Sequence, residues 1–391
     1  MKVRYKLASS TWDDKEIEAI KKVVSTGFYT MGDFVSKFES NFADFFKSKY
    51  AVMVNSGSSA NLLAIASLFF IQKNPLKKGD EVIVPCVSWS TTYTPLQQYG
   101  LKVKFVDIDL KTLNYDVEKL NDAVSDKTRL IVAVNLLGNP NNFNKINSII
   151  ANRDILLFED NCESMGAMFN RRYTGTFGIA GSFSSFFSHH ISTMEGGIIL
   201  TNNTEIYNIL LSIRAHGWTR NLKDNNPIHV KNKNKFYESF NFILPGYNLR
   251  PLEFSGAIGL EQLKKLPNLI RARKNNASYF YKLFSSNENF IIQKEIGESS
   301  WFGFSLILNK QNISISRDDL VLLMEKNGIE TRPIVSGNFL NNKVLKYFDY
   351  EVHGDPKNAE YVDKNGIFIG NHHYDLSEEL DYLNKIIKNI D

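Results

Sequence analysis

A pair of histidines lies at the most informative place in this sequence for chemistry. His189 and His190 belong to the segment SFSSFFSHHISTMEGG, residues 182–197, and no lysine occurs between Gly181 and Thr201. A histidine with its ordinary pKa of about 6.5 takes and returns a proton near neutral pH, whereas a free lysine at about 10.4 stays protonated. Imidazole forms no stable imine with an aldehyde, because its nitrogens belong to an aromatic ring. The segment therefore predicts a histidine that transfers protons and forms no covalent bond with an aldehyde ligand.

Polar residues that follow apolar runs are the next candidates, because ligands of open α/β sheets bind beyond the carboxyl ends of the strands. Asp160 ends the run DILLFED, and Gly57 and Ser58 follow the run AVMVN. The Asp160 carboxylate could keep the nitrogen of a bound pyridine ring protonated. The free backbone N–H groups at the helix start after Gly57 could bind a phosphate group of a ligand. Ordinary structural roles fit as well, a helix cap at Asp160 and an N-cap at Ser58 or Ser59, and the residues alone leave both interpretations open.

The elements that position these residues follow from the pattern of apolar side chains. Between residues 51 and 202, helical or loop stretches alternate with the apolar runs AVMVN, EVIVPCVS, KVKFVDI, LIVAVNL, DILLFED, GSFSSFF and GGIILT. Most runs are too continuously apolar for a sheet with one wet face, which predicts a mostly parallel sheet covered by helices on both sides. Before them, we expect an amphipathic helix over residues 13–25, capped by Thr11 and stopped by Gly27. Its apolar face should consist of Ile17, Ile20, Val23 and Val24.

The pattern changes after Gly246. The segment LEFSGAIGLEQLKKL and the stretch from Pro267 to Phe284 read as helices, and strand-like SWFGFSLIL and helix-like DDLVLLMEKNG follow. A chain of 391 residues with 43% hydrophobic content suits one large domain and a smaller one. We therefore expect an N-terminal helix and a large α/β domain over residues 1–265, and a smaller C-terminal α+β domain over residues 266–391.

Composition argues against several classes of protein. The net charge of +4 is spread along the chain without a run of five basic residues, so nucleic acid is not an expected partner. The longest apolar run, residues 62–71, is interrupted by Ser67 and is too short for a bilayer, and the N-terminus lacks a signal-peptide core; we expect no membrane partner and a cytoplasmic protein. Two cysteines, Cys86 and Cys162, provide neither a disulfide framework nor the four ligands of an all-cysteine iron-sulfur cluster. No metal is expected.

Taken together, the motifs resemble the sugar aminotransferase (DegT/DnrJ/EryC1-type) family of pyridoxal 5'-phosphate (PLP) enzymes. In that family a Ser-Phe-Ser-Phe strand leads to a lysine six residues before Glu-Gly-Gly, and counting back six from Glu195 arrives at His189. The resemblance extends from GFYTMG, which begins at residue 27, to GNHH, which begins at residue 370. It implies PLP-dependent fold type I, similar to aspartate aminotransferase, with a mostly parallel central sheet. Without the lysine, PLP or its aminated form, pyridoxamine 5'-phosphate (PMP), is expected to be bound noncovalently.

The resemblance also implies roles for single residues. Gly57, Ser58 and Ser184 match the contacts to the cofactor phosphate, and Asp160 matches the partner of the pyridine nitrogen. Glu163 stands where aminotransferases commonly have Gln, and is expected near the ring hydroxyl of the cofactor.

Two further positions depend on the resemblance. Trp89, after EVIVPCVS, matches the residue that stacks on the cofactor ring, although a tryptophan at a strand end also fits a core position. Asn248, in the segment GYNLRP, matches an asparagine that reaches the phosphate held by the other subunit, which implies a homodimer with shared active sites.

The remaining polar candidates have less support from the sequence. His189 is expected as the acid and base, while His190 fits a structural role better. His216, Arg220 and Arg332 are candidates for contact with a carboxylate or phosphate of the substrate, since guanidinium grips such groups in two places. Surface solubility accounts for most arginines, so the alternative stays open.

The lysine replacement resembles the dehydratase branch of the family. That resemblance implies loss of the C3 hydroxyl from a GDP-linked 4-keto-6-deoxy sugar, a mannose-type hexose or a related heptose, with glutamate as amino donor. Products would be ammonia and a GDP-4-keto-3,6-dideoxy sugar of the kind used in O-antigen, lipopolysaccharide or capsule biosynthesis. His189 would move the proton while Asp160 sustains the electron sink, with no iron-sulfur cluster. The alternatives are a nucleotide-sugar 4-aminotransferase and a catalytically degenerate member that only binds its ligand.

Overall fold

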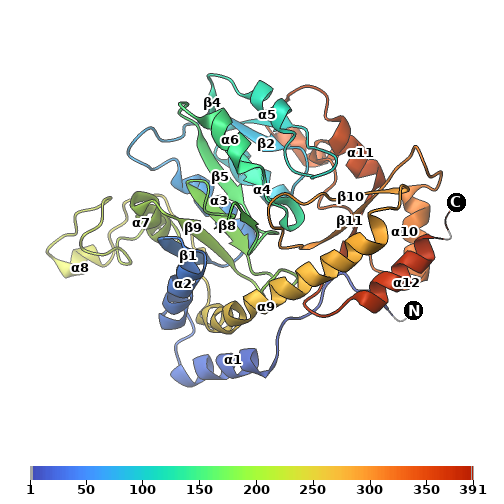
Figure 1. Cartoon of the computed structure of the whole chain (residues 1–391). Coiled ribbons are helices and arrows are strands. Elements are labelled where there is room, and N and C mark those ends of the chain that lie inside the picture. The colour runs from blue at the N-terminus through green and yellow to red at the C-terminus, as the bar shows by residue number, and fades with distance from the viewer. Residues whose placement is uncertain (1–2, 389, 391) are drawn as a thin grey trace.

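An eight-stranded sheet dominates the computed structural model, which describes residues 3–388 and 390 (Figure 1). In spatial order its strands are β1 (Tyr50–Val54), β9 (Gly197–Thr201), β8 (Ala180–Ser184), β5 (Leu156–Asp160), β4 (Thr128–Val134), β2 (Glu81–Pro85), β3 (Lys102–Val106) and β12 (Tyr350–Val352). Neighbouring strands from β8 to β12 pair in parallel, and β9 is antiparallel to both of its neighbours. The expected mostly parallel sheet is confirmed, and each apolar run of the sequence supplies one of its strands.

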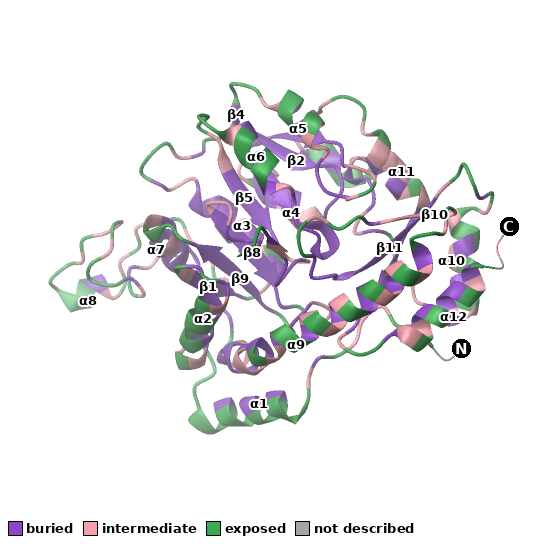
Figure 2. Cartoon of the chain, in the orientation of Figure 1, coloured by how far each residue is buried: buried purple, intermediate pink, exposed green. Residues whose placement is uncertain are grey.

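Helices pack on both faces of this sheet because its strands bury both sets of alternating side chains. On β1, Val52 and Val54 belong to a core cluster that includes residues of α3 (Gly57–Ser67), α4 (Ser90–Gln98) and α7 (Thr204–Ile213). Ala51 and Met53 of the same strand face a second cluster with residues of α2 (Asp33–Phe45) and α9 (Glu253–Phe284). Further along the sheet, α5 (Val117–Ala123) and α6 (Phe143–Ile150) supply a third cluster. Figure 2 shows most of the central strands in the colour of buried residues, and β2, β8 and β9 are buried along their length.

The N-terminal helix was predicted correctly in place but not in detail. Helix α1 (Asp14–Thr26) ends at Gly27, whose φ of 67° is the left-handed conformation that glycine adopts readily. Its cap is Asp13 rather than Thr11, because Asp13 and Glu16 form a reciprocal capping box. The expected apolar face is confirmed at Val23 but wrong at Ile17 and Val24, which are exposed, while Glu16 and Ala19 are buried.

The C-terminal part of the chain forms a second core around a small sheet. Strands β10 (Phe290–Ile292), β11 (Gly303–Leu308) and β13 (Gly366–Gly370) pack with α10 (Arg317–Lys326), α12 (Ser377–Ile387) and the end of α9. Helix α9 is continuous through Pro267, so the expected boundary at residue 265 falls within it. Tyr5 also packs in this core, and β12 returns to the large sheet. The division into 1–265 and 266–391 stays a prediction.

The remaining elements are short connections. They are α8 (Lys235–Glu238), α11 (Lys357–Asn365), the strands β6 (Met168–Phe169) and β7 (Arg172–Tyr173), and the 3-10 turns η1 (Leu136–Gly138), η2 (Phe339–Asn341) and η3 (Lys343–Tyr347). Residues 215–250, here called the arm, carry α8 away from the sheet, at the left of Figure 1. Within residues 3–388 and 390, no helix combines the length and the apolar character needed to cross a membrane.

Candidate active site

A cavity of about 290 Å³ opens at the carboxyl ends of the central strands. It gathers eight of the residues predicted from the sequence, namely Gly57, Ser58, Trp89, Asp160, Glu163, Ser184, His189 and Arg332. Its lining also includes Asn61, Cys162, Phe186, Ser188, Glu195 and Phe302. Among the described residues that line the cavity, none is a lysine.

Asp160 forms the floor of the cavity at the end of β5. The register of the sheet pairs it with Val134 of β4 and Ser182 of β8, which places it between two strand ends. Its Oδ2 accepts hydrogen bonds from Asn61 Nδ2 and Thr92 Oγ1, both at 2.8 Å, and its Oδ1 accepts from the backbone N–H of Cys162 at 3.1 Å. Three donors therefore fix the orientation of one buried carboxylate, which lines the cavity.

The start of helix α3 supplies a cradle for an anion. The N-cap is Ser56, whose side chain accepts from the N–H of Ser59 at 3.1 Å, so the suggested caps at Ser58 and Ser59 are wrong. Ser58 is instead exposed to the cavity. A Cβ on Gly57 would lie 2.6 Å from the Cβ of Ser184, so the turn admits no side chain there. Backbone N–H groups at the helix start and the hydroxyls of Ser58 and Ser184 thus surround a space suited to a phosphate.

His189 lies on the loop between β8 and β9. Its ring packs against Phe302 with centroids 5.1 Å apart, and against the edge of Phe186 at 6.0 Å. Burial, and secondarily the charges of Arg332 and Arg273, lower the pKa of His189 to about 3. The imidazole is therefore neutral near pH 7, which is the form that accepts a proton. Its Nδ1 is buried without a hydrogen-bond partner among the described residues.

Glu163 and Arg332 approach each other at the side of the cavity. Arg332 Nη2 lies 3.5 Å from Glu163 Oε1, and the backbone N–H of Leu137 donates to Glu163 Oε2 at 3.2 Å. Burial raises the pKa of Glu163, while Arg332 and the Leu137 N–H oppose that change. The Arg332 guanidinium also lies 4.2 Å from the ring centroid of Phe368, and its Nε is buried without a partner. One loosely paired guanidinium is thus available to an anionic ligand.

The sequence left open whether Trp89 lies in the core or at the site, and whether His190 is structural or catalytic. Their positions in the structure distinguish these alternatives. Trp89 is 56% exposed and lines the cavity, so it is not a core residue. His190 is fully buried, and its Nε2 lies 3.1 Å from the carbonyl oxygen of Ser300. Burial lowers the pKa of His190 well below its usual range, which fits the structural role expected for it.

Three predicted residues lie in the arm rather than in the cavity lining. The backbone N–H of His216 donates to the carbonyl of Tyr247 at 2.6 Å. The guanidinium of Arg220 lies 4.6 Å from the ring centroid of Trp218, and Asn248 Oδ1 accepts from Arg250 Nε at 3.0 Å. Their roles with substrate and cofactor stay predictions, because this chain alone does not bring them to the cavity.

Sequence reasoning missed the residues that support Asp160 and His189. Asn61 and Thr92 were detectable in principle, since each lies in the first turns of a helix that follows a strand of the sheet. Phe302 carried no such signal, because it lies far from His189 in the sequence, just before β11, and reaches it only through the tertiary fold.

The cavity fits a PLP-type cofactor on its own geometry. It combines a phosphate cradle, a fixed carboxylate, an exposed indole and two buried nitrogens without partners, on His189 and Arg332. Gly57, Ser58 and Ser184 would hold the phosphate, Asp160 the ring nitrogen, and Trp89 one face of the ring.

This chain is similar to known proteins over almost its whole length. Residues 10–388 match the DegT/DnrJ/EryC1/StrS aminotransferase family. GDP-4-keto-6-deoxy-D-mannose 3-dehydratase of Escherichia coli O55:H7 is 62% identical over 388 residues, which cover 99% of this chain and 100% of that protein.

Solved structures are similar over nearly the whole chain. The E. coli GDP-4-keto-6-deoxy-D-mannose-3-dehydratase with bound hydrated PLP has a TM-score of 0.97 at 61% identity, covering 99% of this chain and 100% of that one. A GDP-4-keto-6-deoxymannose-3-dehydratase with a trapped PLP-glutamate geminal diamine has a TM-score of 0.96 at 61% identity, covering 98% and 100%. The overall arrangement of this chain is therefore that of fold type I, as expected.

Proposed function

Because this chain belongs to the DegT/DnrJ/EryC1/StrS aminotransferase family, we propose that it is a PLP-dependent 3-dehydratase of a GDP-4-keto-6-deoxy sugar. The reaction consumes glutamate, which donates its amino group and two electrons and leaves as 2-oxoglutarate, and it yields ammonia and a GDP-4-keto-3,6-dideoxy sugar. Support comes from the relative at 62% identity and from the structures solved with PLP and with a PLP-glutamate adduct. The sugar is a mannose-type hexose or a related heptose, and the protein works in the cytoplasm.

One observation carries the proposal. The cavity keeps the phosphate cradle and the fixed carboxylate of Asp160, yet presents His189 and no lysine among its described lining residues. An amine that tethers the cofactor and expels an aminated product is therefore missing from the lining, which favours elimination over simple amino transfer.

Asp160 and His189 have different roles in the proposed reaction. When bound, the cofactor supplies an amine that condenses with the C4 ketone and a conjugated ring that accepts electrons. Asp160 would hold the ring nitrogen in its protonated form, which would sustain that electron sink. His189, which is neutral, would take a proton from the cofactor carbon that carries the amine and would deliver it to the oxygen of the C3 hydroxyl, which would leave as water.

Charged ligands require further contacts. Arg332 binds a carboxylate of glutamate or a phosphate of the sugar nucleotide, exchanging its 3.5 Å approach to Glu163 for a bidentate contact. Glu163 would lie near the ring hydroxyl of the bound cofactor. In a homodimer, Asn248 of the arm completes the phosphate site of the other subunit, and His216 and Arg220 face the substrate there. The arm exposes aromatic side chains that such an interface would cover.

The proposal is tested by incubating the protein with PLP, glutamate and a GDP-4-keto-6-deoxy sugar. We expect release of ammonia and a 3-deoxy sugar, measured by coupled assay and mass spectrometry. A stable 4-amino sugar would show an aminotransferase, and binding without turnover would show a degenerate member. Equal concentrations of hexose and heptose substrates then decide which sugar is preferred.

The His189→Asn variant tests the proton transfer itself. We expect loss of at least about 10²-fold in turnover, since general acid-base catalysis contributes that much or more, with PLP binding retained. PLP absorbance measures the binding. Undiminished turnover would remove His189 from the reaction.

A further inference from the structure

The loop that carries His189 projects from the sheet and needs support from elsewhere. Residues 185–196 close on themselves: the N–H of Ser185 donates to the carbonyl of Gly196 at 2.9 Å, and the N–H of Phe187 donates to the carbonyl of Met194 at 3.1 Å. These contacts define the shape of the loop. They do not connect it to the rest of the molecule, and Phe186, Phe187 and Met194 are exposed.

Two side chains from distant segments hold the base of this loop at Ser192. The backbone N–H of Ser192 donates to Gln262 Oε1 at 3.0 Å, and its carbonyl oxygen accepts from Trp12 Nε1 at 2.9 Å. Gln262 belongs to α9, and Trp12 lies just before α1. Both polar groups of one buried backbone unit are thus satisfied by side chains rather than by a neighbouring strand.

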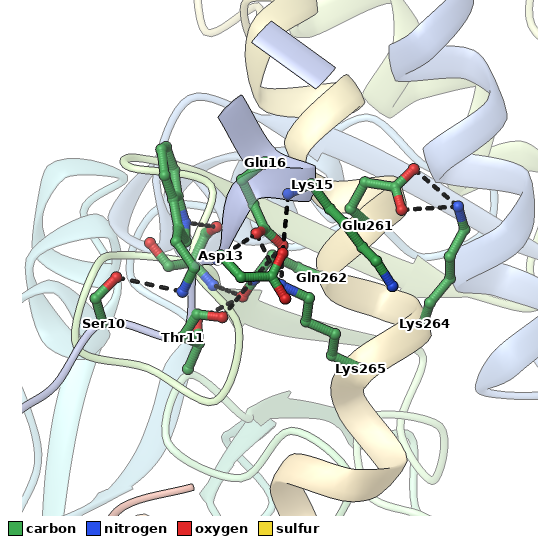
Figure 3. A network of polar contacts seen from close by, with 11 residues as sticks. Ser10, Thr11, Asp13, Lys15, Glu16, Glu261, Gln262, Lys264 and Lys265 are labelled. Atoms are coloured by element: carbon green, nitrogen blue, oxygen red, sulfur yellow. Dashed lines mark hydrogen bonds and ion pairs between the residues drawn. The ribbon is translucent and has the colours of Figure 1, made fainter. Parts of the chain in front are cut away.

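Gln262 is itself held in one orientation (Figure 3). Thr11 Oγ1 donates to Gln262 Oε1 at 2.6 Å, while Gln262 Nε2 donates to the carbonyl of Thr11 at 3.2 Å and to Glu16 Oε1 at 2.7 Å. Lys265 lies 2.7 Å from the buried carboxylate of Glu16. Every hydrogen-bonding capacity of the amide is used, so the Gln262 oxygen offered to Ser192 has a fixed position.

The orientation of His189 depends on such supports because its own ring has few. Its Nδ1 has no hydrogen-bond partner among the described residues, and the ring is held by packing on Phe302. On one side the N–H of His189 donates to the carbonyl of Phe186, and on the other Ser192 is clamped only three residues along. Proton transfer is sensitive to distance, and a displacement of about 1 Å costs about 10²-fold in rate.

We propose that Trp12 and Gln262 are positioning residues for His189. Their clamp on Ser192 fixes the loop together with the contact between His190 and the Ser300 carbonyl. The N-terminal segment thereby becomes part of the catalytic apparatus without touching substrate or cofactor. The inference rests on the proposed function, because it requires His189 to move the proton.

Trp12→Phe tests the clamp with the smallest change in volume, since it removes the donor to Ser192 and keeps an aromatic ring. With the PLP-loaded full chain, we expect kcat for ammonia release to fall about 10-fold while KM for sugar and glutamate stays within about 2-fold. Gln262→Met, which removes the other half of the clamp, should act in the same direction. An unchanged kcat in both variants would overturn the proposal.

Two control variants separate positioning from stability. Lys264→Gln alters an exposed ion pair with Glu261 on the same helix and should leave kcat unchanged. Val23→Ala leaves a cavity beneath α1 and should lower the melting temperature without lowering kcat. If Val23→Ala slows turnover as much as Trp12→Phe at equal cofactor loading, the effect is one of stability and the proposal fails.

A double-mutant cycle shows whether Trp12 acts through His189. In single turnover with long incubation, Trp12→Phe should cause no further loss when added to His189→Asn. An equal loss in both backgrounds would overturn the positioning role. If His189→Asn alone retains full turnover, the proposed function of His189 fails instead, which is a different result from failure of the clamp.

Discussion

The floor of the cavity, formed by Asp160, and the arm differ in their burial and in the hydrogen bonds that fix them. Asp160 is buried and receives three hydrogen bonds from its own chain. The arm, residues 215–250, contains one four-residue helix, α8, and exposes aromatic side chains at Phe236 (80%), Tyr237 (67%), Phe240 (64%) and Phe242 (53%). One chain completes the floor, whereas the arm leaves aromatic side chains exposed.

The contrast has a physical origin. Strand ends are placed by hydrogen-bond register, so a residue such as Asp160 reaches its position once the sheet has formed. The arm belongs to no strand of the sheet, and only isolated bridges such as Ala215–Asn248 and Trp218–Phe242 pair its two ends. A large exposed apolar surface commonly marks an interface. We therefore expect substitutions in the floor to act within one chain and substitutions in the arm to act between chains.

The largest effect is expected from Asp160→Asn. Losing the negative charge opposite the ring nitrogen weakens the electron sink, and we expect turnover to fall about 10²- to 10³-fold, as measured by ammonia release. The adjacent carboxylate provides a matched control. Glu159 accepts from the N–H groups of Gly175 and Gly178 at 2.6 and 2.7 Å, away from the cavity lining.

Burial raises the pKa of Glu159 to about 7. In Glu159→Gln the amide NH2 would face one of the two glycine N–H groups, so we expect lower stability. The folded, cofactor-loaded protein should nevertheless retain turnover within a few fold, because Glu159 does not line the cavity. Equal losses in Glu159→Gln and Asp160→Asn would mean that the floor acts only as scaffold, and that the assignment of Asp160 to the ring nitrogen is wrong.

An intermediate effect is expected from the arm, and complementation shows where it acts. Asn248→Ala should lower turnover about 10-fold through loss of a phosphate contact, on the order of 1.4 kcal/mol. The variant is then mixed with inactive His189→Asn protein under conditions of subunit exchange. If Asn248 serves the other subunit, half of the sites in each mixed dimer are intact, and turnover should rise to about a quarter of that of the unmodified protein.

The same mixture of Asn248→Ala and His189→Asn proteins can also show that Asn248 does not serve the other subunit. When Asn248 and His189 serve the same subunit, each site of a mixed dimer carries one defect and no intact site forms. Turnover that does not exceed the average of the two variants would therefore assign Asn248 to its own chain, or to no site at all.

The contrast also explains how far the sequence could be interpreted. The strands, the phosphate cradle at Gly57 and the cavity floor at Asp160 were predictable from the sequence. In each case the polar residues directly follow an apolar run in the chain. The clamp on Ser192 was not, since Trp12 and Gln262 come from segments far apart in the sequence. The face of α1 was misjudged because periodicity does not reveal that Glu16 would be buried beside Lys265.

The smallest effect concerns stability, where core and arm should respond to different ranges of pH. Burial lowers the pKa of His372 to about 4, against about 6.5 when the chain is unfolded. Between these values the unfolded state binds the proton and the folded state does not, so the free energy of unfolding falls with decreasing pH, by up to about 1.4 kcal/mol per pH unit for this histidine.

The arm should lose its electrostatic support only at lower pH. Hydrogen bonds from Thr219 and Asn232 lower the pKa of Glu238 to about 2, and a carboxylate with a depressed pKa contributes stability that is lost as pH falls below about 4.5. Chemical unfolding at pH 7, 6 and 5 should therefore show a decline that His372→Gln makes shallower and Glu238→Gln leaves unchanged. If Glu238→Gln alters the slope in this range while His372→Gln does not, the arm rather than the buried histidine governs stability above pH 5, and the contrast between the two regions is reversed.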